Sequence, residues 1–150
     1  MPEVIRFYSV ADEYGEFSNF ASYPIRLEKR TWPTTEHYFQ AMKFENRRDQ
    51  DEIRETKSPM VAARKGRSRK RKLRKGWERS RVEVMRKALR AKFTQHEDLQ
   101  ELLLDTGDAE IVEHTQRDSF WGDGGDGSGT NMLGKLLMQI RDELAEEQSD

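Results

Sequence analysis

Apolar residues recur at helical spacing along the second half of the chain, and this pattern limits the fold more than any other feature of the sequence. Spacings of three, four and seven residues place side chains on one face of an α-helix. The three series are Val82, Met85, Leu89 and Phe93; Leu99, Leu102 and Leu103; and Leu133, Leu136, Leu137, Ile140 and Leu144. Because each such face must be buried against another element, we predict a predominantly α-helical core.

Short segments rich in β-branched and aromatic residues predict a few strands among these helices. They are Val4–Tyr8, the hairpin of Ile25–Glu28 with Arg30–Trp32, and Glu110–His114. The expected fold class is therefore α+β, predominantly α-helical, with a few short β-strands. A chain of 150 residues predicts a single compact domain over 1–150, with its core at about 5–145 and a short flexible C-terminal tail.

Composition excludes several kinds of chemistry. The chain has no cysteine, which rules out disulfides, thiolate metal sites and cysteine nucleophiles. Its three histidines lack the spacing of a zinc site, so we expect no metal. No signal-like segment opens the sequence and no long apolar run crosses it, so we expect a soluble cytoplasmic protein without a membrane partner.

Charge is distributed unevenly although the net charge is only -1. The basic run, Arg64–Arg81, contains eleven lysines and arginines against Glu78 alone. Three interpretations stay open: a solvated surface, an electropositive rim that attracts phosphates, and a nuclear-targeting segment. Within the run, Trp77 is either a packing anchor or a face on which a base stacks.

The segment Trp32–Phe44 predicts the start of a helix that has an acid, an amide and an amine on one side. Pro33, two threonines and then Glu36 form a helix start, because threonine oxygens accept free backbone N–H groups and a carboxylate suits the positive helix end. Helical spacing places Glu36 on one side with Phe39, Gln40 and Lys43. This side is either an ordinary solvated charged face or part of a functional site.

Helix boundaries follow from capping residues. We expect the first helix to continue to about Arg47 and a polar helix to cover Asp49–Lys57. Ser58 can cap a new helix that has Pro59 at its first position. Thr130 or Asn131 is the expected cap of the last helix.

Two loops contain candidate ligand-binding groups. In the first, Phe17-Ser18-Asn19-Phe20, two aromatics flank polar groups that could stack on and hydrogen-bond a planar ligand, or the aromatics could simply pack in the core. The second is the glycine-rich loop, Asp118–Asn131, which enters the last helix. Free backbone N–H groups there could bind an anion, although the loop matches no P-loop, GxGxxG or EF-hand pattern and could be a flexible connection.

Together, these ordered motifs resemble the NADAR family of YbiA-like proteins. The resemblance covers Phe7 to Leu144 and rests on four groups of residues: Phe17–Phe20, Trp32–Phe44, Lys92-Phe93 with Leu99–Gly107, and Asp118–Gly122 with Asn131–Gly134. It implies an α-rich α+β fold and an N-glycosidase, a hydrolase acting on N-glycosyl compounds that requires no cofactor. The implied substrates are phosphoribosylamino-pyrimidine intermediates of riboflavin synthesis or ADP-ribosylated guanine. The basic run is denser than the family pattern requires.

The resemblance suggests roles for the candidate residues. Cleavage of a ribosyl–nitrogen bond passes through an oxocarbenium-like state, which needs a carboxylate near the anomeric carbon and a source of a proton. We assign Glu36 and Asp118 as the catalytic pair. The expected substrate-binding residues are Asn19 and Gln40 for polar edges, Phe20, Trp77 and Trp121 for stacking, and Lys43, Gly122 and Asn131 for phosphate. Lys43 could instead keep Glu36 ionised.

Two functions of other classes fit the same sequence. A non-catalytic ADP-ribose or NAD-binding module needs the same pocket without the acid. A nucleic-acid-binding protein would use the basic run together with Trp77, and its affinity would fall steeply with salt. The expected partners are thus an ADP-ribosyl or phosphoribosyl small molecule, with ADP-ribosylated nucleic acid as a further candidate.

Overall fold

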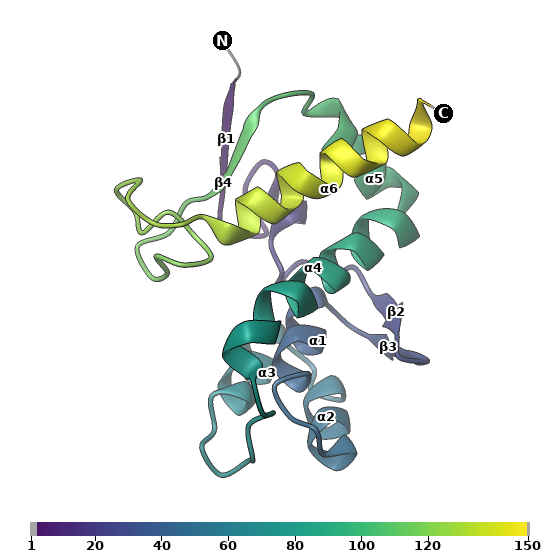
Figure 1. The fold of residues 1–150 in the computed structure, drawn as a ribbon, viewed down its shortest axis with the longest axis vertical. Helices are drawn as coiled ribbons and strands as arrows, with labels where there is room; N and C mark the ends of the chain where they lie inside the picture. Colours follow the sequence, from purple (N-terminus) through teal and green to yellow (C-terminus); the bar gives the residue numbers. More distant parts are fainter. Residues whose placement is uncertain (1–2, 150) are drawn as a thin grey trace. The chain divides into compact units, whose positions relative to one another are not determined.

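The computed structural model describes residues 3–149 and divides the chain into two compact units. The terminal unit combines Met1–Ala21 with His96–Asp150, and the central unit is Ser22–Gln95. The described residues contain six α-helices and four short strands, which confirms the predominantly helical α+β class (Figure 1).

The central unit gathers four helices and a hairpin. The helices are α1 (Thr35–Ala41), α2 (Arg47–Arg54), α3 (Pro59–Gly66) and α4 (Trp77–Gln95). The hairpin pairs β2 (Ile25–Leu27) with β3 (Arg30–Trp32) in antiparallel register, as the sequence predicts. Helix α1 packs against α2, α3 and α4 and is buried along its whole length. It is therefore the core helix of this unit.

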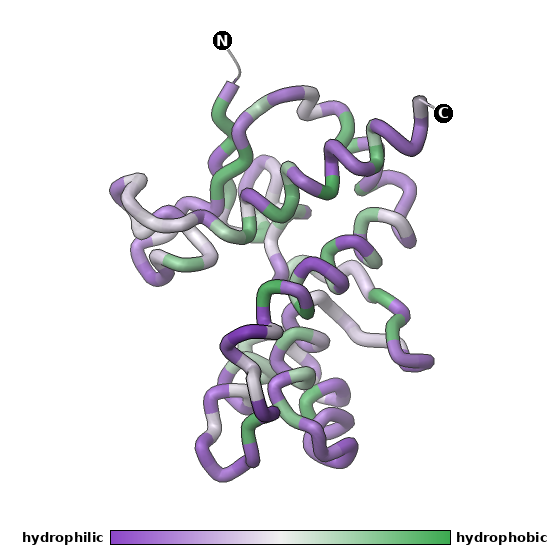
Figure 2. Tube along the Cα trace, viewed as in Figure 1, coloured by the Kyte–Doolittle hydropathy of each residue, from purple (hydrophilic) through white to green (hydrophobic). Residues whose placement is uncertain are grey.

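The terminal unit is built on a two-stranded parallel sheet. Strand β1 (Val4–Phe7) pairs with β4 (Glu110–Glu113), and α6 (Met132–Gln148) packs on β4 and on α5 (Glu97–Asp105). A short 3-10 helix, η1 (Gly15–Phe17), follows β1. The predicted apolar face of the last helix is confirmed, because its five leucine and isoleucine positions are all buried. Figure 2 shows the corresponding alternation of apolar and polar residues along α6.

Two helix boundaries were predicted wrongly. Helix α1 ends at Ala41 instead of near Arg47, because Phe44 leaves the helix to form an isolated β-bridge with Leu73. The polar helix starts at Arg47, because the side chain of Asn46 accepts hydrogen bonds from the backbone N–H groups of Arg48 and Asp49, and it ends at Arg54. A long-range bridge and a local cap thus set boundaries that helical spacing did not predict.

Other expectations concern the extent of the domain and its surroundings. The single domain and the flexible tail stay predictions; α6 continues to Gln148, while Met1, Pro2 and Asp150 lie outside the described residues. Between residues 3 and 149, no helix has the length and apolar character needed to cross a membrane. Among the same residues, no three histidine, aspartate or glutamate side chains are grouped so that they could hold a metal ion.

Candidate functional site

The start of α1 is fixed by a buried threonine and a buried histidine. The Oγ1 atom of Thr34 accepts a hydrogen bond from the backbone N–H of His37 at 3.1 Å, which confirms the predicted threonine cap. The ring of His37 lies between Thr34 Oγ1, 2.8 Å from Nδ1, and the carbonyl oxygen of Thr56, 3.1 Å from Nε2. Since a carbonyl only accepts, Nε2 carries the proton. Burial lowers the pKa of His37, and the hydrogen bond to Thr56 only partly opposes this.

Glu36 lies in the first turn of α1 and is buried. Its Oε2 atom accepts a hydrogen bond from Nε2 of Gln40 at 2.7 Å, one helical turn later. Glu36 is 9% exposed and Gln40 is 7% exposed, so the interpretation of this side as a solvated charged face is wrong. A buried carboxylate oriented by an amide is an arrangement suited to chemistry.

Lys43 extends this cluster beyond the end of α1. Its ammonium group donates to the carbonyl oxygen of Gly66 at 3.4 Å and lies 5.9 Å from the centre of the Phe39 ring. Burial lowers the pKa of Lys43, while the negative charge of Glu36 acts in the opposite direction. We call Glu36, Gln40 and Lys43 the α1 cluster.

Trp77 starts α4 and packs beside the same helix. Its ring lies 5.2 Å from that of Phe39 with an interplanar angle of 57°, and only 5% of the residue is exposed. The indole is thus a packing contact in this structure, and its stacking on a substrate stays a prediction.

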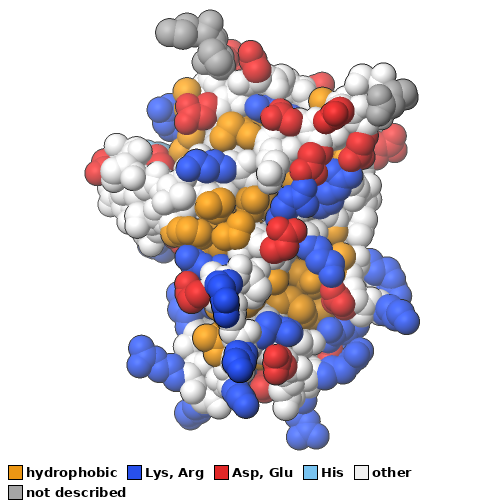
Figure 3. Space-filling model, viewed as in Figure 1, with side chains coloured by type: hydrophobic (Ala, Val, Ile, Leu, Met, Phe, Trp, Pro, Cys, Tyr) orange, Lys and Arg blue, Asp and Glu red, His pale blue; other side chains and the backbone are white. Residues whose placement is uncertain are grey.

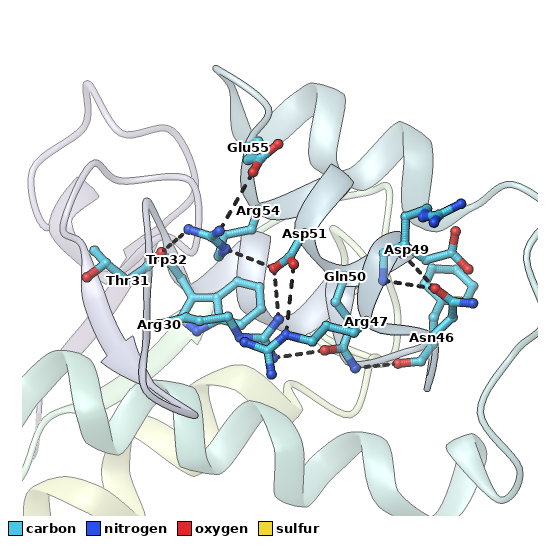
Figure 4. Close-up of polar contacts among 12 residues, drawn as sticks. Arg30, Thr31, Trp32, Asn46, Arg47, Asp49, Gln50, Asp51, Arg54 and Glu55 are labelled. Carbon is cyan, nitrogen blue, oxygen red and sulfur yellow. Dashed lines mark hydrogen bonds and ion pairs between the residues drawn. The ribbon is translucent and has the colours of Figure 1, made fainter.

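A polar network joins the hairpin to α2 beside the entry to α1 (Figure 4). Arg30 on β3 donates to Asp51 Oδ1 at 3.0 Å and to Gln50 Oε1 at 2.8 Å, and its guanidinium lies 4.7 Å from the centre of the Trp32 ring. The hydrogen bond from Arg30 is the main reason why the pKa of Asp51 is lowered; a second comes from Arg54. The network ties the residues that precede Pro33 to a neighbouring helix.

The basic run separates into structural and exposed side chains. Lys65 and Arg71 pair with Glu52, and Arg74 donates to the carbonyl oxygen of Met42 at 2.9 Å. Exposed members without an ion pair among residues 3–149 are Arg64, Arg67, Arg69, Lys70, Lys72, Lys75 and Arg79. In Figure 3, lysine and arginine side chains gather in the lower part of the view, where Figure 1 places α2 and α3.

The acids of the glycine-rich loop in the terminal unit accept hydrogen bonds from the backbone. Asp118 Oδ1 accepts from the N–H groups of Phe120 at 2.9 Å and Trp121 at 2.7 Å. Asp123, which the sequence analysis missed, accepts from the N–H groups of Thr115 and Gly125 and from His114 Nδ1 at 2.7 Å. Burial would raise the pKa of Asp123, but the hydrogen bond from His114 and those from the two N–H groups outweigh it, so this pKa is lowered.

Asn131 occupies the N-cap position of α6, one of the two positions predicted for the cap, with a φ of 54°. Its side chain does not act as a cap, because it makes no capping hydrogen bond. Instead, its amide donates to the carbonyl oxygen of Ile111 at 2.9 Å and accepts from the N–H of Glu113 at 3.0 Å. The side chain therefore occupies the edge of β4 as a neighbouring strand would.

The backbone N–H groups expected to bind an anion are largely engaged within the loop. Asn131 donates to the carbonyl oxygen of Gly122, Met132 to that of Phe120, and Leu133 to that of Trp121. Gly122 itself is tightly packed, since an added Cβ would lie 2.7 Å from a Thr115 methyl group. Phosphate binding by Gly122 and Asn131 stays a prediction.

The remaining candidates lie in the same unit. Asn19 is buried, and Phe20 is 38% exposed. Trp121 is half-buried, with its ring 5.0 Å from Phe120 in an edge-to-face contact. A cavity of about 250 Å³ lies beside the loop, and its lining includes Asn131 and Lys135.

The structure thus brings the predicted residues together in two sets. Glu36, Gln40 and Lys43 form one cluster in the central unit, and Asp118, Trp121, Gly122 and Asn131 belong to one loop of the terminal unit. Glu36 and Asp118 belong to different units, so their catalytic pairing stays a prediction.

Comparisons with known proteins agree with this architecture. The model of the NADAR domain family matches residues 6–145. N-glycosidase YbiA of Escherichia coli is 58% identical over 144 residues, covering 96% of this chain and 90% of that protein. An N-glycosidase of Nostoc punctiforme is 43% identical over 143 residues, covering 93% and 92%.

Two further matches are a relative named as a riboflavin biosynthesis protein and a solved structure. A riboflavin biosynthesis protein of Vibrio vulnificus is 42% identical over 146 residues, which cover 97% of this chain but 40% of that protein. The NMR structure of E. coli YbiA superposes with a TM-score of 0.92 at 56% identity, covering 100% of this chain and 90% of the other. By sequence and by fold, the chain belongs to the NADAR family.

Proposed function

We propose that the protein is an N-glycosidase that hydrolyses the bond between a phosphorylated ribose and a nitrogen of a nucleobase-like ring. The observation that carries this proposal is the buried Glu36 carboxylate, oriented by Gln40 at 2.7 Å and accompanied by Lys43. The names of relatives as N-glycosidases support the same reaction class.

The α1 cluster suits the demands of this reaction. As the bond from the anomeric carbon to nitrogen breaks, its electron pair stays with nitrogen, and positive charge develops on the sugar. The Glu36 carboxylate stabilises that charge and takes a proton from the water that adds to the anomeric carbon. Because Glu36 is buried, its charge acts through a medium of lower effective dielectric than water.

Other groups complete the proposed mechanism. Asp118 assists at the ribose hydroxyls or in returning a proton to the departing nitrogen. Lys43 contacts a phosphate or keeps Glu36 ionised. A carboxyl group that returns a proton acts as a general acid, and a lysine ammonium beside a phosphate or a carboxylate stabilises negative charge.

For the substrate, we favour a phosphoribosylamino-pyrimidine, because two relatives are named riboflavin biosynthesis proteins. ADP-ribosylated guanine is the second candidate, and the exposed arginines and lysines of the basic run favour it, since they suit a pyrophosphate or a nucleic-acid backbone. Both candidates are charged nucleotide derivatives, so we place the reaction in the cytoplasm.

The test is mass spectrometry of products from the wild-type protein and two variants, Glu36→Gln and Glu101→Gln, with each candidate substrate. Glu36→Gln keeps the size of the side chain and an acceptor for Gln40 but removes the charge. We expect about a hundredfold or greater loss of turnover, the range typical for a catalytic acid or base. Glu101 is an exposed acid on α5, so its variant should retain full turnover.

Each result has a distinct meaning. Ribose 5-phosphate with free aminopyrimidine would identify the first substrate, and free ADP-ribose with restored guanine would identify the second. Undiminished turnover by Glu36→Gln would remove Glu36 from the mechanism. No product from either substrate, with retained binding of ADP-ribose, would favour the non-catalytic module.

A further inference from the structure

Gly66, the last residue of α3, packs directly against the side chain of Gln40. A Cβ atom built on Gly66 would lie 2.0 Å from Gln40 Oε1, 2.7 Å from its Cδ and 3.0 Å from its Cβ. Atoms do not approach so closely, so any side chain at position 66 would displace the Gln40 amide.

The backbone of Gly66 does not explain why glycine is present there. Gly66 is helical and is not among the glycines with positive φ, whereas Gly76, with a φ of 76°, has the conformation that favours glycine. In a helix, alanine is the better helix former. The space beside Gln40 is therefore what requires glycine.

The Gln40 amide depends on that space for its orientation. Its Nε2 atom donates to Glu36 Oε2, but its Oε1 atom is buried and has no hydrogen-bond partner among residues 3–149. The carbonyl side of the amide is thus held by contact with Gly66 and not by a donor. The carbonyl oxygen of Gly66 also accepts from Lys43 Nζ at 3.4 Å. A single residue consequently contacts both polar neighbours of Glu36 in the α1 cluster.

We propose that Gly66 is a positioning residue that acts on Glu36 through Gln40. Its missing side chain lets the amide lie where it can donate to the carboxylate. This inference rests on the proposed function, because it assumes that Glu36 takes part in glycosidic cleavage.

A double-mutant cycle tests the route from Gly66 through Gln40. With the phosphoribosylamino-pyrimidine as substrate, Gly66→Ala should lower kcat by about tenfold or more and change KM by a smaller factor, since the displaced amide no longer orients the reacting carboxylate. In a Gln40→Ala background the displaced amide is absent, so Gly66→Ala should change kcat by less than about twofold. Equal losses in both backgrounds, or unchanged kcat in the single variant, would overturn the proposal.

A second glycine in a helix controls for damage to the fold. In Gly134→Ala, the added Cβ would lie 2.1 Å from the backbone oxygen of Ile111, so this variant should unfold at a lower temperature. In Gly66→Ala, the three atoms nearest to the added Cβ all belong to the Gln40 side chain, so this variant should unfold near the wild-type temperature. If Gly66→Ala is destabilised as much as Gly134→Ala, its effect on kcat is a folding effect and the proposal fails.

An NMR measurement separates this proposal from the proposed function. The side-chain NH₂ resonances of Gln40 report its hydrogen bond to Glu36 whether or not the protein turns over a substrate. We expect both resonances to move in Gly66→Ala and to stay in place in the exposed control Glu101→Gln. Unmoved resonances in Gly66→Ala would overturn the positioning role. Absence of turnover in the wild-type protein, with moved resonances in Gly66→Ala, would instead count against the N-glycosidase assignment alone.

Discussion

The α1 cluster and the glycine-rich loop both combine acids with amides, but they use them differently. In α1, backbone hydrogen bonds along the helix and the Thr34 cap engage backbone groups, and Glu36 and Gln40 bond to each other through their side chains. In the loop, Asp118 and Asp123 accept from backbone N–H groups that no regular ladder satisfies. Polar side chains on a helix are therefore available for chemistry, while those in an irregular loop are largely needed for the loop itself.

This contrast bears on the choice between candidate acids. Glu36 accepts a hydrogen bond from the side chain of Gln40 and lies near Lys43, a cation whose pKa is lowered. Asp118 uses a single oxygen, Oδ1, for its two backbone bonds. A catalytic role is compatible with the structural role of Asp118 because the hydrogen bonds to Phe120 and Trp121 leave Oδ2 unused.

The largest effect on stability is expected from Asn131, whose side chain bonds twice to the backbone of β4. Asn131→Ala removes one buried and one part-buried hydrogen bond to β4 and places alanine at a φ of 54°. Lost hydrogen bonds and left-handed strain each cost about 1 to 2 kcal/mol, so we expect the free energy of unfolding to fall by about 3 kcal/mol. Urea unfolding measures this change.

Asn131→Gly is the matched control for this prediction. Glycine loses the same two hydrogen bonds but tolerates the positive φ, so its loss should be smaller by about 1 kcal/mol. If both variants unfold like the wild-type protein, the side chain of Asn131 does not support β4, and the contrast between loop and helix fails.

In the central unit, the start of α1 was predictable from sequence, but its end was not. Spacing alone anticipated that Glu36 and Gln40 share a face, and the threonine before them gave the cap. The end of α1 was missed because the bridge between Phe44 and Leu73 joins residues far apart in the chain. Local periodicity contains no signal for such a pairing.

The glycine-rich loop shows where sequence patterns stop being informative. Its glycines suggested free N–H groups, but the structure engages those of Asn131 and Met132 with carbonyl oxygens of the same loop. Asp123 could have been suspected from its place before two glycines, a pattern typical of turns. The packing of Gly66 on Gln40 had no sequence signal, since it depends on how α1 meets α3.

The two units should also respond to acid at different pH. The folded pKa of His37 in the central unit lies below its ordinary value of 6.5, so the unfolded chain binds its proton first. Its contribution to stability is complete above pH 6.5 and is lost as pH falls through the lower folded pKa. Asp123 in the terminal unit has a pKa below 3.8, so its contribution is lost only under more acidic conditions.

Hydrogen exchange at a series of pH values, resolved by residue, measures this difference. Between pH 7 and pH 5, we expect protection to decrease in α1 and to change less in β4, after correction for the intrinsic pH dependence of exchange. In His37→Gln, which removes the titrating ring, the decrease in α1 should disappear. Equal decreases in α1 and β4 would show that His37 does not set the acid sensitivity of its unit.

The smallest effect is expected from the network that supports the entry to α1. In Arg30→Lys, one ammonium cannot replace a guanidinium that reaches Asp51 at 3.0 Å and Gln50 at 2.8 Å while lying over Trp32. We expect a loss of about 1 kcal/mol in the free energy of unfolding. Arg54 also pairs with Asp51, and its side chain is more exposed than that of Arg30. Arg54→Lys should therefore cost about 0.3 kcal/mol. If the two variants lose equal amounts, the contacts of Arg30 with Gln50 and Trp32 add nothing to its ion pair with Asp51.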